Sequence, residues 1–395
     1  MTRIALVGLG KMGLSHLSLL RPLPDVELVG VCDSAGYVLD VLEKYTGIPT
    51  FTDYADMLRR AAPEAVVIAT PTHLHGPMVR AAVERGIHVF CEKPLVLDPV
   101  EGAELTRLAE ARGVVTQVGY HNRYVGTFCE VRRLLDLGAI GRVRSVLAEA
   151  YGPVVLRPAG RSWRSRRGSG GGSLYDYAAH PLDLLTWYLG EPLGVRGARL
   201  TSIHSSETDD AVAATIAYPG ATAVLNVDWS DGSQRKMSTR LTLWGEKGRI
   251  FADRQEVQVH LSGNGPVPEG YEPGWNVRFG TDLTPAPAFY VRGEEYSAQL
   301  EDFVRRVASH EVAGRSTFAT ALSTDRLIAA IRVADGAPDG AETTTTSPQV
   351  SPAVVGSPAV NGRTPSNRHR NGQPAPLAVM LRSVAGSLAG LRRSA

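Results

Sequence analysis

The chain has 395 residues, of which 43% are hydrophobic and 21% charged, so it is long enough for two globular domains with a substantial core. Its formal net charge of +2 is too small to indicate a nucleic-acid partner. Its three cysteines have no CxxC spacing, and neither a secretory signal nor an apolar run of membrane-spanning length is evident. We therefore expect a cytoplasmic protein without disulfides and without a membrane partner.

Residues 3–13, RIALVGLGKMG, combine a short apolar strand with the glycine pattern G-x-G-x-x-G. The first glycine permits a tight turn, the second lets a pyrophosphate approach the backbone, and the third lets the next helix pack on the strand. The helix N-terminus then presents N–H groups to phosphates. The alternative is an ordinary strand-turn-helix unit. The predicted cofactor contacts in this segment are Gly8, Gly10, Lys11, Met12 and Gly13.

A second apolar strand, residues 26–32, is followed by Asp33, which lies 20 residues past Gly13. A carboxylate at this position can accept hydrogen bonds from the adenosine ribose, although a solvated aspartate is the alternative. Its charge would repel a 2′-phosphate, and the next residues, Ser34 and Ala35, supply no arginine to bind one. The sequence therefore predicts NAD rather than NADP as cofactor.

Strand-like and helix-like segments alternate over the first 120 or so residues, as a doubly wound parallel sheet requires. We assign residues 1–122 to an NAD(P)-binding domain. The further expected strands are residues 49–51, 65–70, 88–92 and 114–120. The expected helices are residues 36–45, one opened by Thr52 and Asp53, one ending at Arg85, and residues 98–112.

The pattern then changes, and residues 123–335 are predicted to form an α+β domain with an open, mainly antiparallel sheet. Strand patterns with few helical stretches run from residue 195 to about 260. The other expected segments are a strand at 142–151, a basic loop at 161–173, a helix at 174–189, an irregular loop at 262–288, and helices at 294–310 and 317–334.

From residue 336 the chain is rich in proline, glycine, serine, threonine and alanine. Such a composition buries too little apolar surface to offset its ordering entropy, so we predict a disordered tail over residues 336–395. Residues 377–391 place apolar side chains at helical spacing next to arginines. A frayed end is the favoured interpretation, and a docking or membrane-surface helix is the alternative.

Chemistry-bearing residues follow the fourth and fifth predicted strands, at the edge where open α/β sheets bind ligands. Thr70, Pro71 and His75 follow one strand, and Glu92 and Lys93 follow the next. All five are predicted cofactor contacts, although His75 precedes a helix and is also consistent with a place near its N-terminus. The Lys93 ammonium can donate to a ribose or substrate oxygen, whereas a surface lysine is the alternative.

Four motifs follow one another along the chain: the glycine pattern, Ala69-Thr70-Pro71, Glu92-Lys93-Pro94 and Gly172-x-x-x-Asp176-x-x-x-His180. From residue 3 to about residue 334 the chain resembles the glucose-fructose oxidoreductase/inositol dehydrogenase/rhizopine catabolism (Gfo/Idh/MocA) family, with Glu-Lys-Pro as the most specific motif. The resemblance implies an N-terminal Rossmann domain and a C-terminal open sheet used in homo-dimer or homo-tetramer contacts. It also implies hydride exchange between NAD(P) and a sugar or cyclitol.

Asp176 and His180 are four residues apart, so on a helix they share one face. Oxidation of a secondary alcohol needs a base for the hydroxyl proton, and His180 is the candidate, with Asp176 orienting it. Lys93 would steady the developing alkoxide. Inositol-dehydrogenase-like members of the family use a lysine, an aspartate and a histidine at matching motif positions. The predicted catalytic residues are therefore Lys93, Asp176 and His180.

The alternative is an amphipathic helix with a core histidine and an aspartate at its N-terminal dipole. Pro181 weakens the first turn of this helix, so the helix could also begin at or just after His180. In that case Asp176 would precede the helix and would not share a helix face with His180. Asp183 shares the face of His180 and is either a substrate contact or a structural polar group.

Two further clusters are candidates for substrate specificity. His121, Arg123 and Tyr124 follow the sixth strand, and Arg164 lies in the basic loop with Arg161, Arg166 and Arg167. Arginine forks suit phosphate or carboxylate groups, which indicates an anionic substrate, whereas a solvated loop is the alternative. The predicted substrate contacts are His121, Arg123, Tyr124, Arg164 and Asp183.

Together these patterns predict an NAD-dependent oxidoreductase that acts on a secondary alcohol or ketone of a sugar, nucleotide sugar or cyclitol. One alternative is an NAD-dependent glycosidase, known in the same family, which would release sugar without net NADH. The other is a non-catalytic sensor that binds a dinucleotide, which would be expected to lack the three catalytic residues. No HExxH or paired CxxC spacing indicates a metal site.

Overall fold

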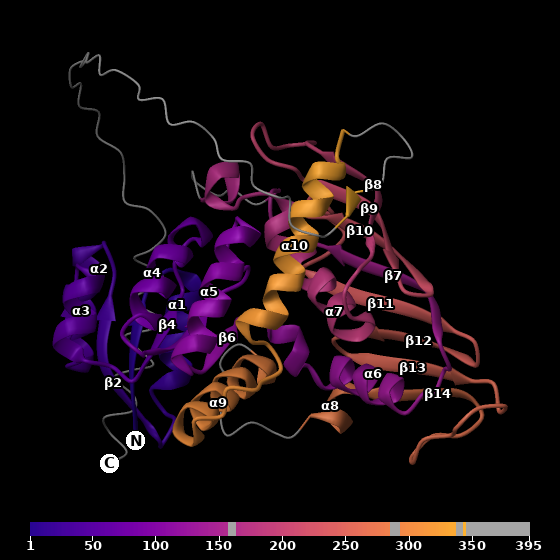
Figure 1. Ribbon diagram of the computed structural model, residues 1–395, viewed down its shortest axis with the longest axis horizontal. Helices are drawn as coiled ribbons and strands as arrows, with labels where there is room; N and C mark the ends of the chain where they lie inside the picture. Colours follow the sequence, from indigo (N-terminus) through magenta and orange to yellow (C-terminus); the bar gives the residue numbers. More distant parts are fainter. Residues whose placement is uncertain (157–162, 285–292, 337–342, 345–395) are drawn as a thin grey trace.

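The computed structural model describes residues 1–156, 163–284, 293–336 and 343–344, which form two sheets with helices between and around them (Figure 1). The first sheet is the predicted doubly wound parallel sheet, with six strands in the order β3-β2-β1-β4-β5-β6. Its strands are β1 (Thr2–Val7), β2 (Val26–Cys32), β3 (Thr50–Phe51), β4 (Ala65–Ile68), β5 (His88–Cys91) and β6 (Thr116–Val118).

The strand order of the first sheet reverses between β1 and β4, because β1 pairs with both β2 and β4. Ligands of open α/β sheets bind outside the carboxyl ends of the strands at such a switch point. All four residues of β4 and of β5 are buried, as expected of strands covered by helices on both faces. This edge is therefore where the candidate residues after β1, β2, β4 and β5 come together.

The helices of the Rossmann domain begin at capping residues that the sequence makes visible. Asp53 accepts from the Asp56 N–H at the start of α3, and Asp98 accepts from the Val100 N–H at the start of α5. The helices are α1 (Lys11–Leu20), α2 (Gly36–Thr46), α3 (Tyr54–Ala61), α4 (His75–Val83) and α5 (Pro99–Arg112), with 3₁₀ turns at Thr72–Leu74 and His121–Tyr124.

The second sheet is mainly antiparallel, as predicted, and belongs to the C-terminal α+β domain. Within the described residues its order is β14-β13-β12-β11-β7-β10-β9-β8-β15, and β7 and β10 form its parallel pair. Its strands are β7 (Val143–Tyr151), β8 (Gly194–Thr201), β9 (Ala211–Tyr218), β10 (Ala221–Asp228), β11 (Ser238–Gly245), β12 (Gly248–Asp253), β13 (Glu256–Leu261), β14 (Gly274–Phe279) and β15 (Thr343–Thr344).

Helices cover one face of the second sheet, and in Figure 1 α6, α7 and α10 lie on the side facing the Rossmann domain. The helical stretch expected at residues 174–189 begins as a π-helix (Leu174–Ala178) and continues as an α-helix. The helices are α6 (Gly126–Asp136), α7 (Ala179–Leu189), α8 (Gly280–Leu283), α9 (Glu294–Ser309) and α10 (Phe318–Ala334), with 3₁₀ turns at Trp163–Ser165 and Arg167–Ser169.

The prediction of an irregular loop at residues 262–288 is wrong for its middle part, which contains β14 and α8. Trp275, Val277 and Phe279 alternate along β14 and are 60%, 48% and 52% exposed. Their period of two was a strand signal, but the surrounding glycines and prolines obscured it. Residues 285–292 lie outside the described part.

Within the stretch expected to be disordered, Thr343 and Thr344 pair antiparallel with β8 as an edge strand. The predicted frayed end or helix at residues 377–391 lies outside the described residues, as do the rest of that tail after Gly336 and Arg161 of the basic loop.

Helix α9, which the predicted division at residue 122/123 assigns to the second domain, packs on the Rossmann sheet. Its Tyr296, Leu300 and Phe303 share one apolar cluster with residues of β1 and α1. Helix α10 contacts α5 and β6 of the Rossmann domain as well as α7 and β8 of the other, so it links the two domains (Figure 1). None of the helices in the described ranges is both long and apolar enough to cross a membrane.

Candidate active site

The glycine turn between β1 and α1 has the geometry that a pyrophosphate site requires. Gly8 has φ +93°, and a Cβ on Gly13 would lie 1.7 Å from the Gly8 carbonyl oxygen, so both positions require glycine. A Cβ on Gly10 would meet no atom within 4 Å, so this backbone faces open space at the N-terminus of α1. Gly8, Gly10, Lys11, Met12 and Gly13 therefore fit a dinucleotide phosphate cradle.

Asp33 lies next to this turn, at the carboxyl end of β2. Its carboxylate accepts hydrogen bonds from the backbone N–H of Leu9, at 2.5 Å, and of Ala35, at 2.8 Å. These two bonds place the charge beside the glycine turn, where the adenosine ribose of a dinucleotide lies in this fold. The residues present thus fit a bound NAD.

His75, a predicted cofactor contact, has a different environment in the structure. Its Nε2 lies 2.9 Å from the carbonyl oxygen of Thr70, and its Nδ1 lies 3.0 Å from that of Pro94. The side chain is buried, and burial lowers its pKa. His75 therefore ties the end of β4 to the Glu-Lys-Pro loop, while Thr70 and Pro71 stay half-buried at the sheet edge.

Glu92, like His75, is bonded to groups within the protein. One of them is His16, which was not among the residues predicted from the sequence. The Nε2 of His16 on α1 lies 2.7 Å from one carboxylate oxygen, and the backbone N–H of Lys93 donates to the other at 3.2 Å. Burial raises the pKa of Glu92, but His16 and the Lys93 charge outweigh it and lower the pKa. Glu92 therefore anchors the Lys93 loop to the cofactor helix.

Lys93 and Asp176 meet across the two domains. The Lys93 ammonium donates to the Asp176 carboxylate at 2.9 Å and to the Asp176 carbonyl at 2.7 Å. Arg164, from the basic loop, donates from Nε to the second carboxylate oxygen at 2.8 Å. Burial raises the pKa of Asp176, but Lys93 and Arg164 outweigh it and hold the pKa below its usual range. Asp176 is therefore an ionised carboxylate between two cations.

His180 does not have the partner that its spacing predicts. No hydrogen bond among the described residues joins it to Asp176, whose carboxylate oxygens are taken by Lys93 and Arg164. Its Nδ1 is buried and has no hydrogen-bond partner within that part of the chain. Burial, followed by the charges of Lys93 and His121, lowers the pKa of His180 well below 6.5. A neutral imidazole beside an ammonium is thus available to accept a proton.

The predicted substrate residues divide into two groups. The His121 ring lies edge-on to that of His180, with centroids 4.8 Å apart, and stacks on Tyr296 at 4.6 Å, so it lies in the same cluster as His180. Arg123, in contrast, makes a buried two-pronged ion pair with Asp183, at 2.7 and 2.8 Å.

The Arg123–Asp183 pair gives the Asp183 carboxylate a partner within the protein, as the structural alternative for Asp183 expects. The Tyr124 hydroxyl donates to Asp302 at 2.8 Å and is also occupied internally. Among the described residues, no group of three or more histidine, cysteine, aspartate and glutamate side chains is placed to hold a metal ion.

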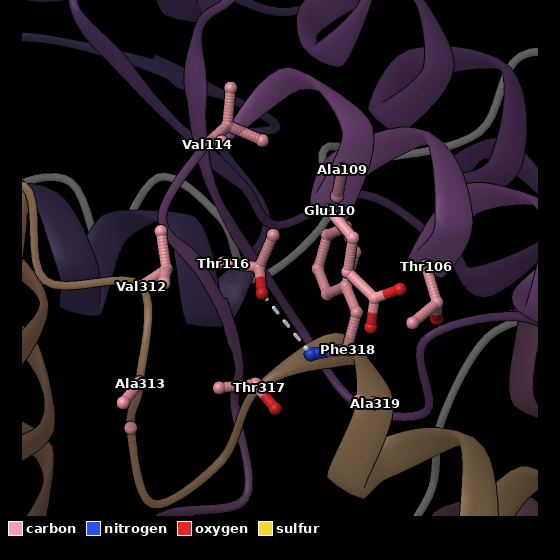
Figure 2. A pocket seen from close by; sticks show the side chains of 12 residues that line it. Thr106, Ala109, Glu110, Val114, Thr116, Val312, Ala313, Thr317, Phe318 and Ala319 are labelled. Carbon is pink, nitrogen blue, oxygen red and sulfur yellow. Dashed lines mark hydrogen bonds between the residues drawn. The ribbon is translucent and has the colours of Figure 1, made fainter.

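A cavity of about 490 Å³ lies elsewhere, between α5, the start of β6 and the start of α10 (Figure 2). Figure 2 shows Thr116 and Phe318 in its wall, joined by a 3.3 Å hydrogen bond from the Phe318 N–H to the Thr116 hydroxyl. Because Thr116 begins β6, this cavity lies at the amino edge of the sheet. Lys93 follows β5 at the carboxyl edge, so the candidate residues do not line the cavity.

Comparison with known families matches two models along the chain. The model described as "Oxidoreductase family, NAD-binding Rossmann fold" (GFO_IDH_MocA) matches residues 2–120. The model described as "GFO/IDH/MocA C-terminal domain" matches residues 128–251. The two matches together cover more than half of the chain.

The chain is 32% identical to inositol 2-dehydrogenase 4 of Saccharopolyspora erythraea over 71% of its own length and 83% of that protein. It is 29% identical to the rhizopine catabolism protein MocA of Rhizobium meliloti over 77% and 86%. Three further curated relatives align over 54–57% of their length, so the chain spans about half of each. Among solved structures, levoglucosan dehydrogenase in complex with NADH superposes with TM-score 0.76 at 22% identity, over 88% of this chain and 100% of that one, which shows a shared fold.

Proposed function

The chain belongs to the Gfo/Idh/MocA oxidoreductase family, and on that premise we propose that it transfers hydride between NAD and a secondary alcohol or ketone of a sugar, nucleotide sugar or cyclitol. One observation carries the proposal. Lys93, which follows β5 at the carboxyl edge of the Rossmann sheet, donates to Asp176 of the other domain, and its charge acts on His180.

In this proposal the chain supplies the proton chemistry of the reaction. His180 is neutral, and its imidazole is the group to which we assign the hydroxyl proton of the alcohol. Lys93 donates a hydrogen bond to the same substrate oxygen as its negative charge grows. NAD bound at the glycine turn supplies the hydride acceptor. In the reverse direction His180 returns the proton to the oxygen of the ketone.

Asp176 has a different role here from the one expected of its spacing. It holds the Lys93 ammonium through both its carboxylate and its carbonyl oxygen, and Arg164 keeps that carboxylate ionised. An ionised partner keeps the ammonium fixed before substrate arrives, which is the preorganisation that electrostatic catalysis requires.

We also propose an anionic group on the substrate. Lys93 and Arg164 bring two positive charges, and Asp176 and Glu92 bring two negative ones, so an anion would be bound by Arg164 itself rather than by a net positive charge. Arg164 uses its Nε on Asp176, and its side chain is 40% exposed, which leaves the Nη groups near the site for a carboxylate or phosphate. A uronate or a nucleotide-linked sugar has such a group.

The experiment that tests the function is incubation of the purified protein with NAD and a panel of neutral sugars, cyclitols, uronates and UDP-sugars, with NADH absorbance and product mass recorded together. Net NADH with one compound supports the dehydrogenase. Cleavage of a glycoside without NADH would replace it by the glycosidase, and NAD binding without turnover would favour the sensor. Turnover of neutral compounds alone would contradict the anionic substrate.

We predict a preference for NAD over NADP of at least about tenfold, because the Asp33 charge at the ribose position repels a 2′-phosphate and leaves it without an arginine partner. Titration of the protein with NADH and NADPH, followed by nucleotide fluorescence, measures it. Asp33→Ser should narrow the difference, while Asp53→Ser, which exchanges one helix-capping residue for another on the same domain, should not. Tighter binding of NADPH by the wild type would overturn the assignment.

We predict that the protein is a homo-dimer or homo-tetramer whose copies meet through the open face of the second sheet. Trp244, Trp275, Val277 and Phe279 are exposed there, while α6 and α7 cover the other face. Light scattering on the eluted protein should give two or four copies. The double variant Trp275→Glu/Phe279→Glu should be a monomer if the wild type is a dimer, and a dimer if the wild type is a tetramer. Tyr37→Glu on α2 should keep the wild-type mass. A monomeric wild type would refute the prediction.

A further inference from the structure

Two adjacent residues of α10 contact the two halves of the candidate active site. The Thr324 hydroxyl lies 3.4 Å from the Asp183 carboxylate and 3.3 Å from the Thr186 hydroxyl, both on α7, the helix that carries His180. The next residue, Asp325, accepts a hydrogen bond from the Val96 N–H at 3.3 Å. Val96 lies three residues after Lys93, so α10 bonds both to the helix of His180 and to the loop of Lys93.

Asp325 is an unusual residue for this place. It is 3% exposed, and its Oδ1 has no hydrogen-bond partner in the described part of the chain. Burial, followed by the neighbouring charge of Asp183, raises the pKa of Asp325 well above its usual range. A buried polar group that is only partly hydrogen-bonded costs stability. Asp325 makes its bond to the Val96 N–H in spite of this cost.

Apart from the Lys93 ammonium, which donates to Asp176, the other bonds to the Lys93 loop come from the Rossmann domain itself. His75 holds the carbonyl groups of Pro94 and Leu95, and His16 holds Glu92. These bonds fix the loop relative to the cofactor turn, but not relative to the helix of Asp176 and His180. Asp325 supplies a bond from α10, and α10 is also joined to the π-helix by a 2.9 Å hydrogen bond from Arg332 to the Tyr175 hydroxyl.

We propose that Asp325 is a positioning residue, which holds the Lys93 loop in register with the helix of Asp176 and His180 through its bond to the Val96 N–H. The proposal rests on the proposed function for its effect on turnover. Lys93 comes from one domain and His180 from the other, so their separation depends on how the domains dock. A displacement of about 1 Å in such a pair can cost about 100-fold in rate.

The test compares Asp325→Ala with Asp325→Asn and with Ser323→Ala as matched control. Asparagine keeps an acceptor oxygen and has nearly the same shape as aspartate. Ser323 lies on the same helix, is also buried and donates to Glu191, away from the Lys93 loop. The readouts are kcat, the Michaelis constants, the melting temperature and hydrogen-deuterium exchange of the peptide that contains residues 93–97.

We expect Asp325→Ala to lower kcat by about 10- to 100-fold with little change in the Michaelis constant for NAD, and to speed amide exchange at Val96. Asp325→Asn should restore most of both, and Ser323→Ala should affect only the melting temperature. Unchanged exchange at Val96, or a loss of kcat no larger than that of Ser323→Ala, would overturn the positioning role. Exchange is measurable whether or not a substrate is found, so it separates this inference from the proposed dehydrogenase activity.

Discussion

We expect the Lys93→Ala variant to lose about 10²- to 10³-fold in kcat while it keeps its affinity for NAD. The Lys93 ammonium is the donor closest to Asp176 and acts, in our proposal, on the substrate oxygen. Its removal leaves the developing negative charge without that hydrogen bond. The glycine turn and Asp33, which form the dinucleotide site, lie on other loops and keep their bonds.

Steady-state kinetics and NADH fluorescence titration on the same preparation measure the two quantities. Arg80→Ala is the control, since Arg80 pairs with Glu104 in an exposed ion pair that contributes little. Asp176 keeps Arg164 in the variant, so its carboxylate is not left unpaired and the fold should persist. A Lys93→Ala protein with wild-type kcat would show that the reacting oxygen does not depend on Lys93.

The first domain was predictable because its signals are local. The glycine pattern, the apolar runs and the caps at Asp53 and Asp98 each lie within a few residues of the structure they specify. The topology then follows, since consecutive parallel strands with crossover helices place the ends of β4 and β5 side by side. The meeting of Thr70 and Glu92 at one edge was therefore foreseeable.

The partners of the site residues were less predictable, because they depend on side chains far apart in the chain. Lys93 and Asp176 are 83 residues apart, and His16 and Glu92 are 76 apart. The spacing of four residues favoured an Asp176–His180 pair, but the Asp176 carboxylate is bonded to Lys93 and Arg164 instead. The sequence motifs identified Lys93, Asp176 and His180 as neighbours, but which of them are bonded to one another depends on how the two domains pack together.

His75 and Arg123 are residues whose partners within the protein could not be predicted from the sequence either. Both lie after strands at the ligand edge, so position alone suggested contact with cofactor or substrate. The structure uses them to satisfy buried groups: backbone carbonyls for His75, and the Asp183 carboxylate for Arg123. A buried carboxylate or carbonyl needs a partner, and that demand is invisible until burial is known.

The second large effect is expected at His180. We predict that His180→Asn lowers kcat for alcohol oxidation by about 10²- to 10⁴-fold, because asparagine is of similar size but cannot accept the hydroxyl proton. The Michaelis constant for NAD should change little, since the glycine turn is unaffected. His73→Asn, at an exposed position after β4, is the matched control and should keep wild-type kcat.

The lowered pKa of His180 determines how the reaction rate and the stability should change with pH. Burial, then Lys93 and His121, lower the pKa of His180 below 6.5, so the base form is present at neutral pH and persists as the pH falls past 6.5. The wild-type kcat/KM for oxidation should therefore decline only at a more acid pH than that of an ordinary histidine. The free energy of unfolding follows the same linkage. Because the unfolded chain takes up the proton first, near pH 6.5, the stability that the neutral His180 gives is fully present above about pH 6.5 and is lost as the pH falls below it.

Rate and melting temperature, recorded from about pH 5 to pH 8 for the wild type and His180→Asn, separate the base from a merely buried histidine. A base predicts that the acid decline of kcat/KM disappears in the variant together with most of the activity. A buried histidine without a catalytic role predicts that only the acid loss of melting temperature is reduced while kcat stays at the wild-type level. The second outcome would remove His180 from the mechanism and leave Lys93, which in our proposal bonds to the same substrate oxygen, as the next candidate to exchange the proton.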